Sequence, residues 1–191
     1  MLPFPLLDET TAPAGARPAL TAAQKNFGMI PNLEKVMASA PPLLTGYTTL
    51  WDLFENTTLT PIERQVVYLT ANFENECNYC VPWHSLLAKQ AGMDPSDIKA
   101  LRAGAGLSDQ KLEALRTFTR TLIANRGKVT VAELQAFFDA GYVDVQALEV
   151  ILGLAIKLMS NFTNSIAGTP LDQEVEHLRW QKPKIEERQD S

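Results

Sequence analysis

The sequence predicts a single all-α domain. Apolar residues recur at three- and four-residue spacing along most of the chain, and helix-start signals separate these runs. No run alternates for long as a β-strand would. The 191 residues fit one domain, and a hydrophobic fraction of 46% suffices for a substantial core without covalent staples. No linker, low-complexity tract or clear internal repeat divides the chain.

The N-terminal half contains the most sharply defined helix start. Residues 1–20 are Pro-rich and lack periodicity, so we expect them to form an extended N-terminal arm. Apolar side chains then recur from Pro41 to about Glu55, which predicts a helix. The segment Thr60-Pro-Ile-Glu63 combines a capping box with proline at the first helical position. A second helix is therefore expected to begin at residue 61.

The C-terminal half continues the same pattern. Four helices are predicted from start signals or apolar periodicity, at Ser85–Gln90, Asp94 to about Arg102, a longer helix capped by Ser108, and Thr130 to near Gly141. The next helix, about Asp144 to Ile166, is apolar nearly all round, which places it at the centre of the bundle or in a subunit interface. We therefore expect a helical domain over residues 21–171, followed by a charged tail over 172–191 that forms a peripheral helix or frays.

Composition narrows the class of protein. The net charge of −5 argues against a nucleic-acid partner, because phosphate binding requires clustered Lys and Arg. The N-terminus lacks a basic segment and carries Asp8 and Glu9 early, unlike a secretory signal. The most apolar stretch, residues 148–159, is too short to span a bilayer and contains Glu149 and Lys157. A soluble cytoplasmic protein with no membrane partner is expected.

The segment Cys77-Asn-Tyr-Cys80-Val-Pro-Trp-His84 carries both cysteines and one of the two histidines. In a reducing cytosol such a pair is more often catalytic, redox-sensing or metal-binding than part of a disulfide scaffold. The three residues share one helical stripe, and Pro82 is tolerated best in a helix's first turn. The thiols are therefore expected at a helix N-terminus, where the helix dipole favours a thiolate and His84 can transfer protons directly or through water.

Two other interpretations of this segment are possible. The cysteines can be inert buried side chains, as free cysteines commonly are. They can also bind zinc, but zinc requires four ligands, and only the distant His177 or carboxylates would complete the set. Two thiols and a histidine on one stripe favour redox chemistry over both. No Gly-x-Gly-x-x-Gly or P-loop motif indicates a cofactor.

The helix over 59–69 and the C-x-x-C-x-x-x-H motif that follows it resemble the carboxymuconolactone decarboxylase/alkylhydroperoxidase D family. Three further stretches resemble the family: Phe27-Gly-Met-Ile-Pro-Asn32, the Gly-x-x-x-x-Asp-Ile pattern at 92–98, and Asn161-Phe-Thr-Asn164. The resemblance covers roughly residues 20–170. It implies an AhpD-like helical bundle that forms a homo-oligomer and acts as a thiol-dependent peroxidase or disulfide reductase.

The resemblance also implies roles for the site residues. Cys80 would attack the hydroperoxide, Cys77 would resolve the sulfenic acid into a disulfide, and His84 would belong to the proton relay. The nearness of Cys80 to His84 in sequence agrees with this assignment. The position of Cys77 nearer the helix end leaves it open as the attacking thiol. The cycle requires a small hydroperoxide and an external dithiol reductant, which the sequence does not identify, and no cofactor.

One position departs from the family pattern. The peroxidase branch has a glutamate twelve positions before the first cysteine, where this chain has Gln65. A glutamine forms hydrogen bonds but does not accept a proton at neutral pH. Glu63, Glu74 and Glu76 lie nearby, and Glu74, three residues before Cys77, is a possible substitute. Peroxidase activity is therefore expected to be weak, or the substrate to be other than a hydroperoxide. Two alternatives also stay open: a lyase of the carboxymuconolactone decarboxylase type, which the C-x-x-C pair disfavours, and a non-enzymatic redox sensor that uses the disulfide as a switch.

Overall fold

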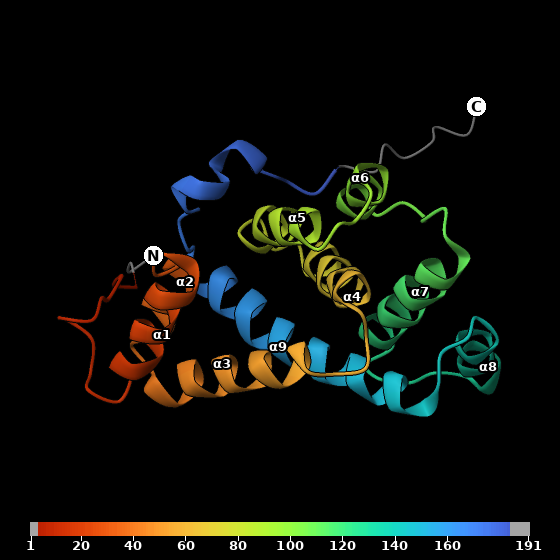
Figure 1. The fold of residues 1–191 in the computed structure, drawn as a ribbon, viewed down its shortest axis with the longest axis horizontal. Coiled ribbons are helices and arrows are strands. Elements are labelled where there is room, and N and C mark those ends of the chain that lie inside the picture. The colour runs from red at the N-terminus through yellow and green to blue at the C-terminus, as the bar shows by residue number, and fades with distance from the viewer. Residues whose placement is uncertain (1–3, 184–191) are drawn as a thin grey trace.

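The computed structural model describes residues 4–183, and these residues form helices and no strand (Figure 1). In chain order the elements are α1 (Arg17–Phe27), α2 (Asn32–Met37), α3 (Pro41–Glu55), α4 (Pro61–Glu74), α5 (Cys80–Gln90), α6 (Pro95–Ala103), α7 (Gln110–Ala124), α8 (Val131–Asp139), α9 (Asp144–Ala167) and the 3₁₀ helix η1 (Gln173–Leu178). The prediction of one all-α domain is confirmed.

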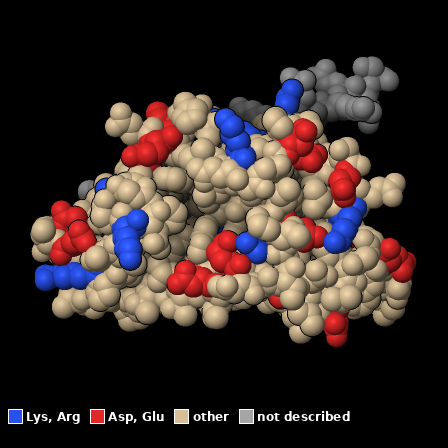
Figure 2. Space-filling view, viewed as in Figure 1, with Lys and Arg blue, Asp and Glu red and all other residues tan. Residues whose placement is uncertain are grey.

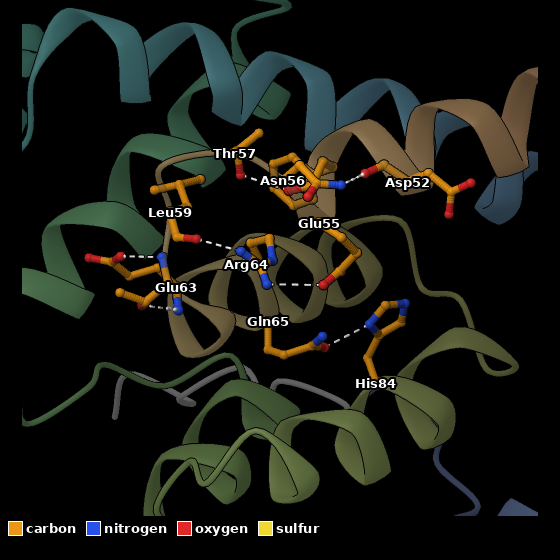
Figure 3. Close-up of polar contacts among 11 residues, drawn as sticks. Asp52, Glu55, Asn56, Thr57, Leu59, Glu63, Arg64, Gln65 and His84 are labelled. Carbon is orange, nitrogen blue, oxygen red and sulfur yellow. Dashed lines mark hydrogen bonds and ion pairs between the residues drawn. The ribbon is translucent and has the colours of Figure 1, made fainter. Parts of the chain in front are cut away.

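Helix α4 is the central element. Ten consecutive residues, 63–72, are buried, and the helix contacts α3, α5, α6, α7 and α9. Its start is the predicted capping box. The Thr60 hydroxyl accepts a hydrogen bond from the Glu63 N–H at 3.2 Å, and the Glu63 carboxylate accepts one from the Thr60 N–H at 2.8 Å (Figure 3). This local signal fixes where the helix enters the core.

Helix α9 packs against both α3 and α4 at a point that admits only glycine. A Cβ atom added to Gly153 would lie 2.8 Å from Cζ of Phe54 and 2.9 Å from Cγ1 of Val67, both of which belong to fully buried side chains. Lys157, Asn161 and Asn164 follow on the same face at helical spacing, and all are buried. The close approach therefore aligns a polar row of α9 with the core of the domain.

The opposite face of α9 is apolar and exposed. Its large side chains at helical spacing are Leu148, Ile151, Leu158, Phe162 and Ile166. Of the helices in the described part of the chain, α9 alone is long and apolar enough to cross a membrane by length and composition. It contacts α2, α3, α4 and α7 within the domain, and 33% of the apolar stretch that meets this criterion is buried. The predicted subunit interface at this helix stays a prediction.

Several predicted boundaries differ from the structure. The predicted arm over 1–20 is not wholly extended, because α1 begins at Arg17 and Ala12, Ala16 and Leu20 are buried. The short helix α2 was not predicted. The cap of α7 is Asp109 and not Ser108, since the Asp109 carboxylate accepts a hydrogen bond from the Leu112 N–H at 2.9 Å.

The C-terminal segment is more integrated than a peripheral tail. Asp172, Val175 and Trp180 are buried, and the Trp180 indole N–H donates to the Arg102 carbonyl at 2.8 Å. Helix η1 packs against α5. The predicted tail over 172–191 is therefore corrected up to residue 183, and residues 184–191 lie outside the described part of the chain.

We predict that Gly153→Ala destabilises the fold. Overpacking costs about 1–3 kcal/mol, which exceeds the gain of about 1 kcal/mol from replacing a helical glycine with alanine. The net loss in the free energy of unfolding should be up to about 2 kcal/mol in urea denaturation. Gly46→Ala is the matched control, because the added Cβ would meet only Cε of Met159 at 3.4 Å. Equal stability changes in the two variants would contradict this account of the close approach.

Candidate active site

The two cysteines lie where the chain enters α5. Cys77 occupies the turn before the helix and Cys80 is its first residue, as predicted, and their sulfurs form a disulfide across a Cα–Cα distance of 5.2 Å. The Cys77 sulfur also accepts a hydrogen bond from the Cys80 N–H at 3.1 Å. Both side chains are buried, at 5% and 2% exposure. The pair is therefore protected from bulk solvent.

Helix α9 supplies hydrogen-bond donors to the Cys80 sulfur. The side-chain amides of Asn161 and Asn164 lie 3.0 and 3.2 Å from it, whereas Asn164 lies 3.8 Å from the Cys77 sulfur. The Asn161 amide also donates to Asn72 Oδ1 at 2.9 Å, which fixes its orientation. Donors directed at a sulfur, together with a helix N-terminus, stabilise a thiolate. In the reduced protein this asymmetry favours Cys80 as the thiolate.

His84 lies one helical turn after Cys80, but its two ring nitrogens contact Gln65 and Lys157 and not the cysteine sulfurs. Nδ1 lies 2.9 Å from Oε1 of Gln65 and Nε2 lies 2.9 Å from Nζ of Lys157 (Figure 3 shows the Gln65 contact). A charged lysine only donates, so Nε2 accepts and the ring proton resides on Nδ1, which donates to Gln65. Gln65, which stands where the family pattern has a glutamate, is thus part of a hydrogen-bonded chain that runs through His84 to Lys157.

Burial governs the electrostatics of this chain of residues. Lys157 is 1% exposed, and its burial lowers its pKa to about 7. Burial, and secondarily the charge of Lys157, hold the pKa of His84 well below its usual range. His84 is therefore neutral at physiological pH, and Lys157 is the group that gains and loses a proton near neutrality.

None of the nearby glutamates replaces the missing carboxylate at position 65. Glu63 is occupied by the capping box and an ion pair with Lys111 at 3.0 Å. The Glu76 carboxylate pairs with Lys182 at 3.2 Å on the surface. Glu74 is half-buried and forms no hydrogen bond to Cys77, Cys80 or His84 within residues 4–183.

A cavity of about 200 Å³ opens beside Cys80. Its walls come from α1, α2, α3, α5 and α9, and Figure 2 shows the surface hollowed between α1 and α2 on one side and α5 on the other. Cys80, His84 and Lys157 line it, whereas Cys77 does not. The aromatic residues that line it are Phe27, Tyr47, Trp51, Tyr79 and Trp83. A molecule in this cavity would therefore meet Cys80 first.

Asp172 holds one wall of the cavity in place. Its carboxylate accepts hydrogen bonds from the Tyr79 hydroxyl, from the Trp83 indole N–H at 2.9 Å and from the Asn32 N–H at 3.0 Å. The first two partners belong to the entry of α5 and the third begins α2. Tyr79 and Trp83 thus both line the cavity and hold its wall together.

Residues 41–120 match the model of the carboxymuconolactone decarboxylase family. The match spans α3 to α7 and includes Cys77, Cys80 and His84. A comparison of the sequence with curated proteins gives no match.

Solved structures share the fold of this chain over nearly its whole length. An alkylhydroperoxidase AhpD core, a peroxidase-related protein from Ralstonia eutropha JMP134, is similar with a TM-score of 0.78 and 20% identity over 95% of this chain and 97% of that one. A peroxidase-related protein from Silicibacter sp. TM1040 gives 0.75 and 20% over 91% and 92%. A cysteine-to-alanine variant of the debrominase Bmp8, in complex with 2,3,4-tribromopyrrole, gives 0.75 and 14% over 93% and 95%. The family and the C-x-x-C disulfide together support a peroxidase-related role.

Within residues 4–183 no group of three or more His, Cys, Asp or Glu side chains gathers as a metal site. His177, the fourth ligand weighed for zinc, is exposed on η1.

Sequence reasoning missed Lys157 as a member of the candidate site. From the sequence, Lys157 is interpreted only as a charge that argues against a membrane span over residues 148–159. Its signal was a single lysine on an otherwise apolar helix, four residues after Gly153 and four before Asn161. A lone charge on a buried helical face needs a partner or a function. The partner, His84, is 73 residues away in sequence, so spacing alone did not reveal it.

We predict a pH-dependent stability that Lys157 causes. Its pKa is about 7 in the folded state and 10.5 ordinarily, so the unfolded chain binds more protons between these values and stability rises with pH there. For the oxidised protein, the free energy of unfolding should rise by about 1–3 kcal/mol between pH 7 and about pH 9, below the range where tyrosines titrate. Lys157→Met should remove this rise.

The exposed Lys25 provides the control, and Lys25→Met should keep the wild-type slope. Urea denaturation at each pH measures both variants. A slope that persists in Lys157→Met would contradict the assignment of a buried, readily deprotonated amine.

Proposed function

We propose that the protein is a thiol-dependent peroxidase-like oxidoreductase that cycles through the Cys77–Cys80 disulfide. The observation that carries the proposal is the asymmetry of the pair. The Cys80 sulfur lines the cavity and receives two amide N–H donors, while Cys77 lies behind it within bonding distance. A nucleophile that faces substrate and a second thiol that follows are the two parts that such a cycle requires.

The cycle balances without a cofactor. The Cys80 thiolate attacks one oxygen of a hydroperoxide, so that an S–O bond forms, the O–O bond breaks, and the alcohol leaves after taking up a proton. The product is a sulfenic acid on Cys80. The Cys77 thiol then attacks that sulfur, which forms the disulfide and releases water. An external dithiol supplies two electrons and two protons to restore both thiols.

Lys157 and His84 would supply the proton for the leaving alkoxide. The amine lines the cavity, and its lowered pKa of about 7 matches a general acid at neutral pH. His84 accepts from the amine at Nε2 and is held by Gln65 at Nδ1, so it orients the lysine and can share its proton. In this arrangement the lysine takes the acid–base role for which a carboxylate was expected.

Reductive dehalogenation of a small aromatic halide is a second candidate. The aromatic walls beside Cys80 favour it, and the debrominase Bmp8 shares the fold. The same dithiol would supply two electrons, so that an aryl bromide and two thiols give the arene, hydrogen bromide and the disulfide. Bromide release from the reduced protein would distinguish this reaction from peroxide reduction.

Cysteine variants test the assignment of the attacking thiol. Cys77→Ser and Cys80→Ser should each abolish multiple turnover of cumene hydroperoxide with a dithiol reductant. Cys77→Ser should still form one sulfenic acid per chain, because Cys80 retains its two amide donors. Mass spectrometry after trapping with dimedone measures this product.

Formation of the sulfenic acid at Cys77 in Cys80→Ser would reverse the assignment. Stopped-flow oxidation of the wild-type thiols separates the remaining alternatives. Rapid loss of both thiols for one peroxide consumed supports the enzyme. Oxidation as slow as that of a free thiol points to a sensor. Lyase activity that survives the loss of both cysteines points to the lyase.

Gln65→Glu should increase peroxide turnover about tenfold, which is less than the roughly 10²–10⁴-fold of a complete general acid–base contribution because Lys157 already supplies part of it. A carboxylate within hydrogen-bond distance of Nδ1 would raise the pKa of His84 and strengthen its share of the proton. The pH dependence of kcat/KM measures the effect. Gln65→Met, which removes the hydrogen bond without adding charge, is the matched comparison. An unchanged rate in both variants would remove position 65 from the mechanism.

A further inference from the structure

A carboxylate without a partner lines the cavity. Glu34 is 6% exposed, and its Oε2 is fully buried and has no hydrogen-bond partner within residues 4–183. Burial, and secondarily the negative charge of Asp172, raise the pKa of Glu34 to about 7. A buried polar group without a partner costs free energy, so its retention calls for an explanation.

Two donors that line the same cavity as Glu34 bond a different carboxylate. The Tyr79 hydroxyl donates to Asp172 and accepts from the Leu33 N–H at 3.1 Å. The Trp83 indole also donates to Asp172. These two donors of the cavity wall thus bond Asp172 and not Glu34. The Asp172 carboxylate holds the wall together, whereas Glu34 lines the cavity and its Oε2 has no hydrogen-bond partner within residues 4–183.

The remainder of the cavity determines what kind of molecule fits. Its aromatic rings come from several elements of the wall, and planar apolar molecules stack on such surfaces. The reactive groups Cys80, His84 and Lys157 line the same space as Glu34. A ligand that fills it therefore meets aromatic walls, one free acceptor and a thiol.

We propose that Glu34 anchors the substrate, and that the substrate is a small aromatic molecule carrying an O–H or N–H donor. The donor would occupy the free carboxylate and the ring would lie between the aromatic walls, which presents the reducible group to Cys80. The inference rests on the proposed function for the reaction that follows, but the binding step needs no turnover.

Calorimetric titration with phenol and anisole tests the anchor. The two compounds differ only in the replacement of the O–H donor by O–CH₃. At about pH 8.5, above the Glu34 pKa of about 7, the carboxylate is ionised, and the oxidised wild-type protein should bind phenol about tenfold more tightly than anisole, as expected for a hydrogen bond to a charged group. Glu34→Met should bind the two compounds equally. Glu34→Gln should retain part of the preference, because its amide oxygen still accepts.

Equal binding of phenol and anisole to the wild type would overturn the proposal, and so would the absence of heat from either at millimolar concentration. A preference that persists in Glu34→Met would overturn it as well. The wild-type comparison needs no variant to fold. Because these titrations use the oxidised, non-cycling protein, a negative result here is separate from a negative result in the peroxide assay.

Discussion

The close crossing of α9 over α3 and α4 at Gly153 is the constraint on which the site depends. At 1.5 Å per residue, the polar row from Gly153 to Asn164 extends about 16 Å along one helix face. That row reaches His84 through Lys157 and the Cys80 sulfur through Asn161 and Asn164. A wider crossing would separate these groups from α5. The glycine therefore acts on the chemistry through helix spacing, although it lies far from the sulfurs in sequence.

The polar groups that the crossing buries depend on one another. Asn161 donates to Asn72 and to Cys80 and accepts from Asn75, so three segments meet at one amide. Lys157 has His84 as its hydrogen-bond partner and no carboxylate within residues 4–183. In a low-dielectric interior such groups are costly when unpaired and strongly directional when paired. The network thus fixes side-chain positions while leaving one amine easy to deprotonate.

Several helix boundaries could be predicted from the sequence, but the contacts between side chains of separate helices could not. Proline, capping boxes and apolar periodicity predicted α3, α4, α8 and α9 closely, because each signal acts within one or two turns. Helices α1 and α2 were not predicted, because they lack a side-chain cap and follow a Pro-rich segment. Within the site, the C-x-x-C-x-x-x-H motif identified the reactive segment. Lys157 and Glu34 required the structure, since their roles depend on contacts between separate helices.

Asp172 links the cavity wall to residues far apart in the chain. Its three partners lie 89 to 140 positions earlier, in α2 and at the entry of α5. Contacts of such long range form late in folding, because closing the intervening loop is entropically costly. During synthesis Cys77 and Cys80 also leave the ribosome well before Asp172, the residue that holds the cavity wall around them. In a growing chain the pair would be open to cellular oxidants and reductants that the finished domain admits only through its cavity.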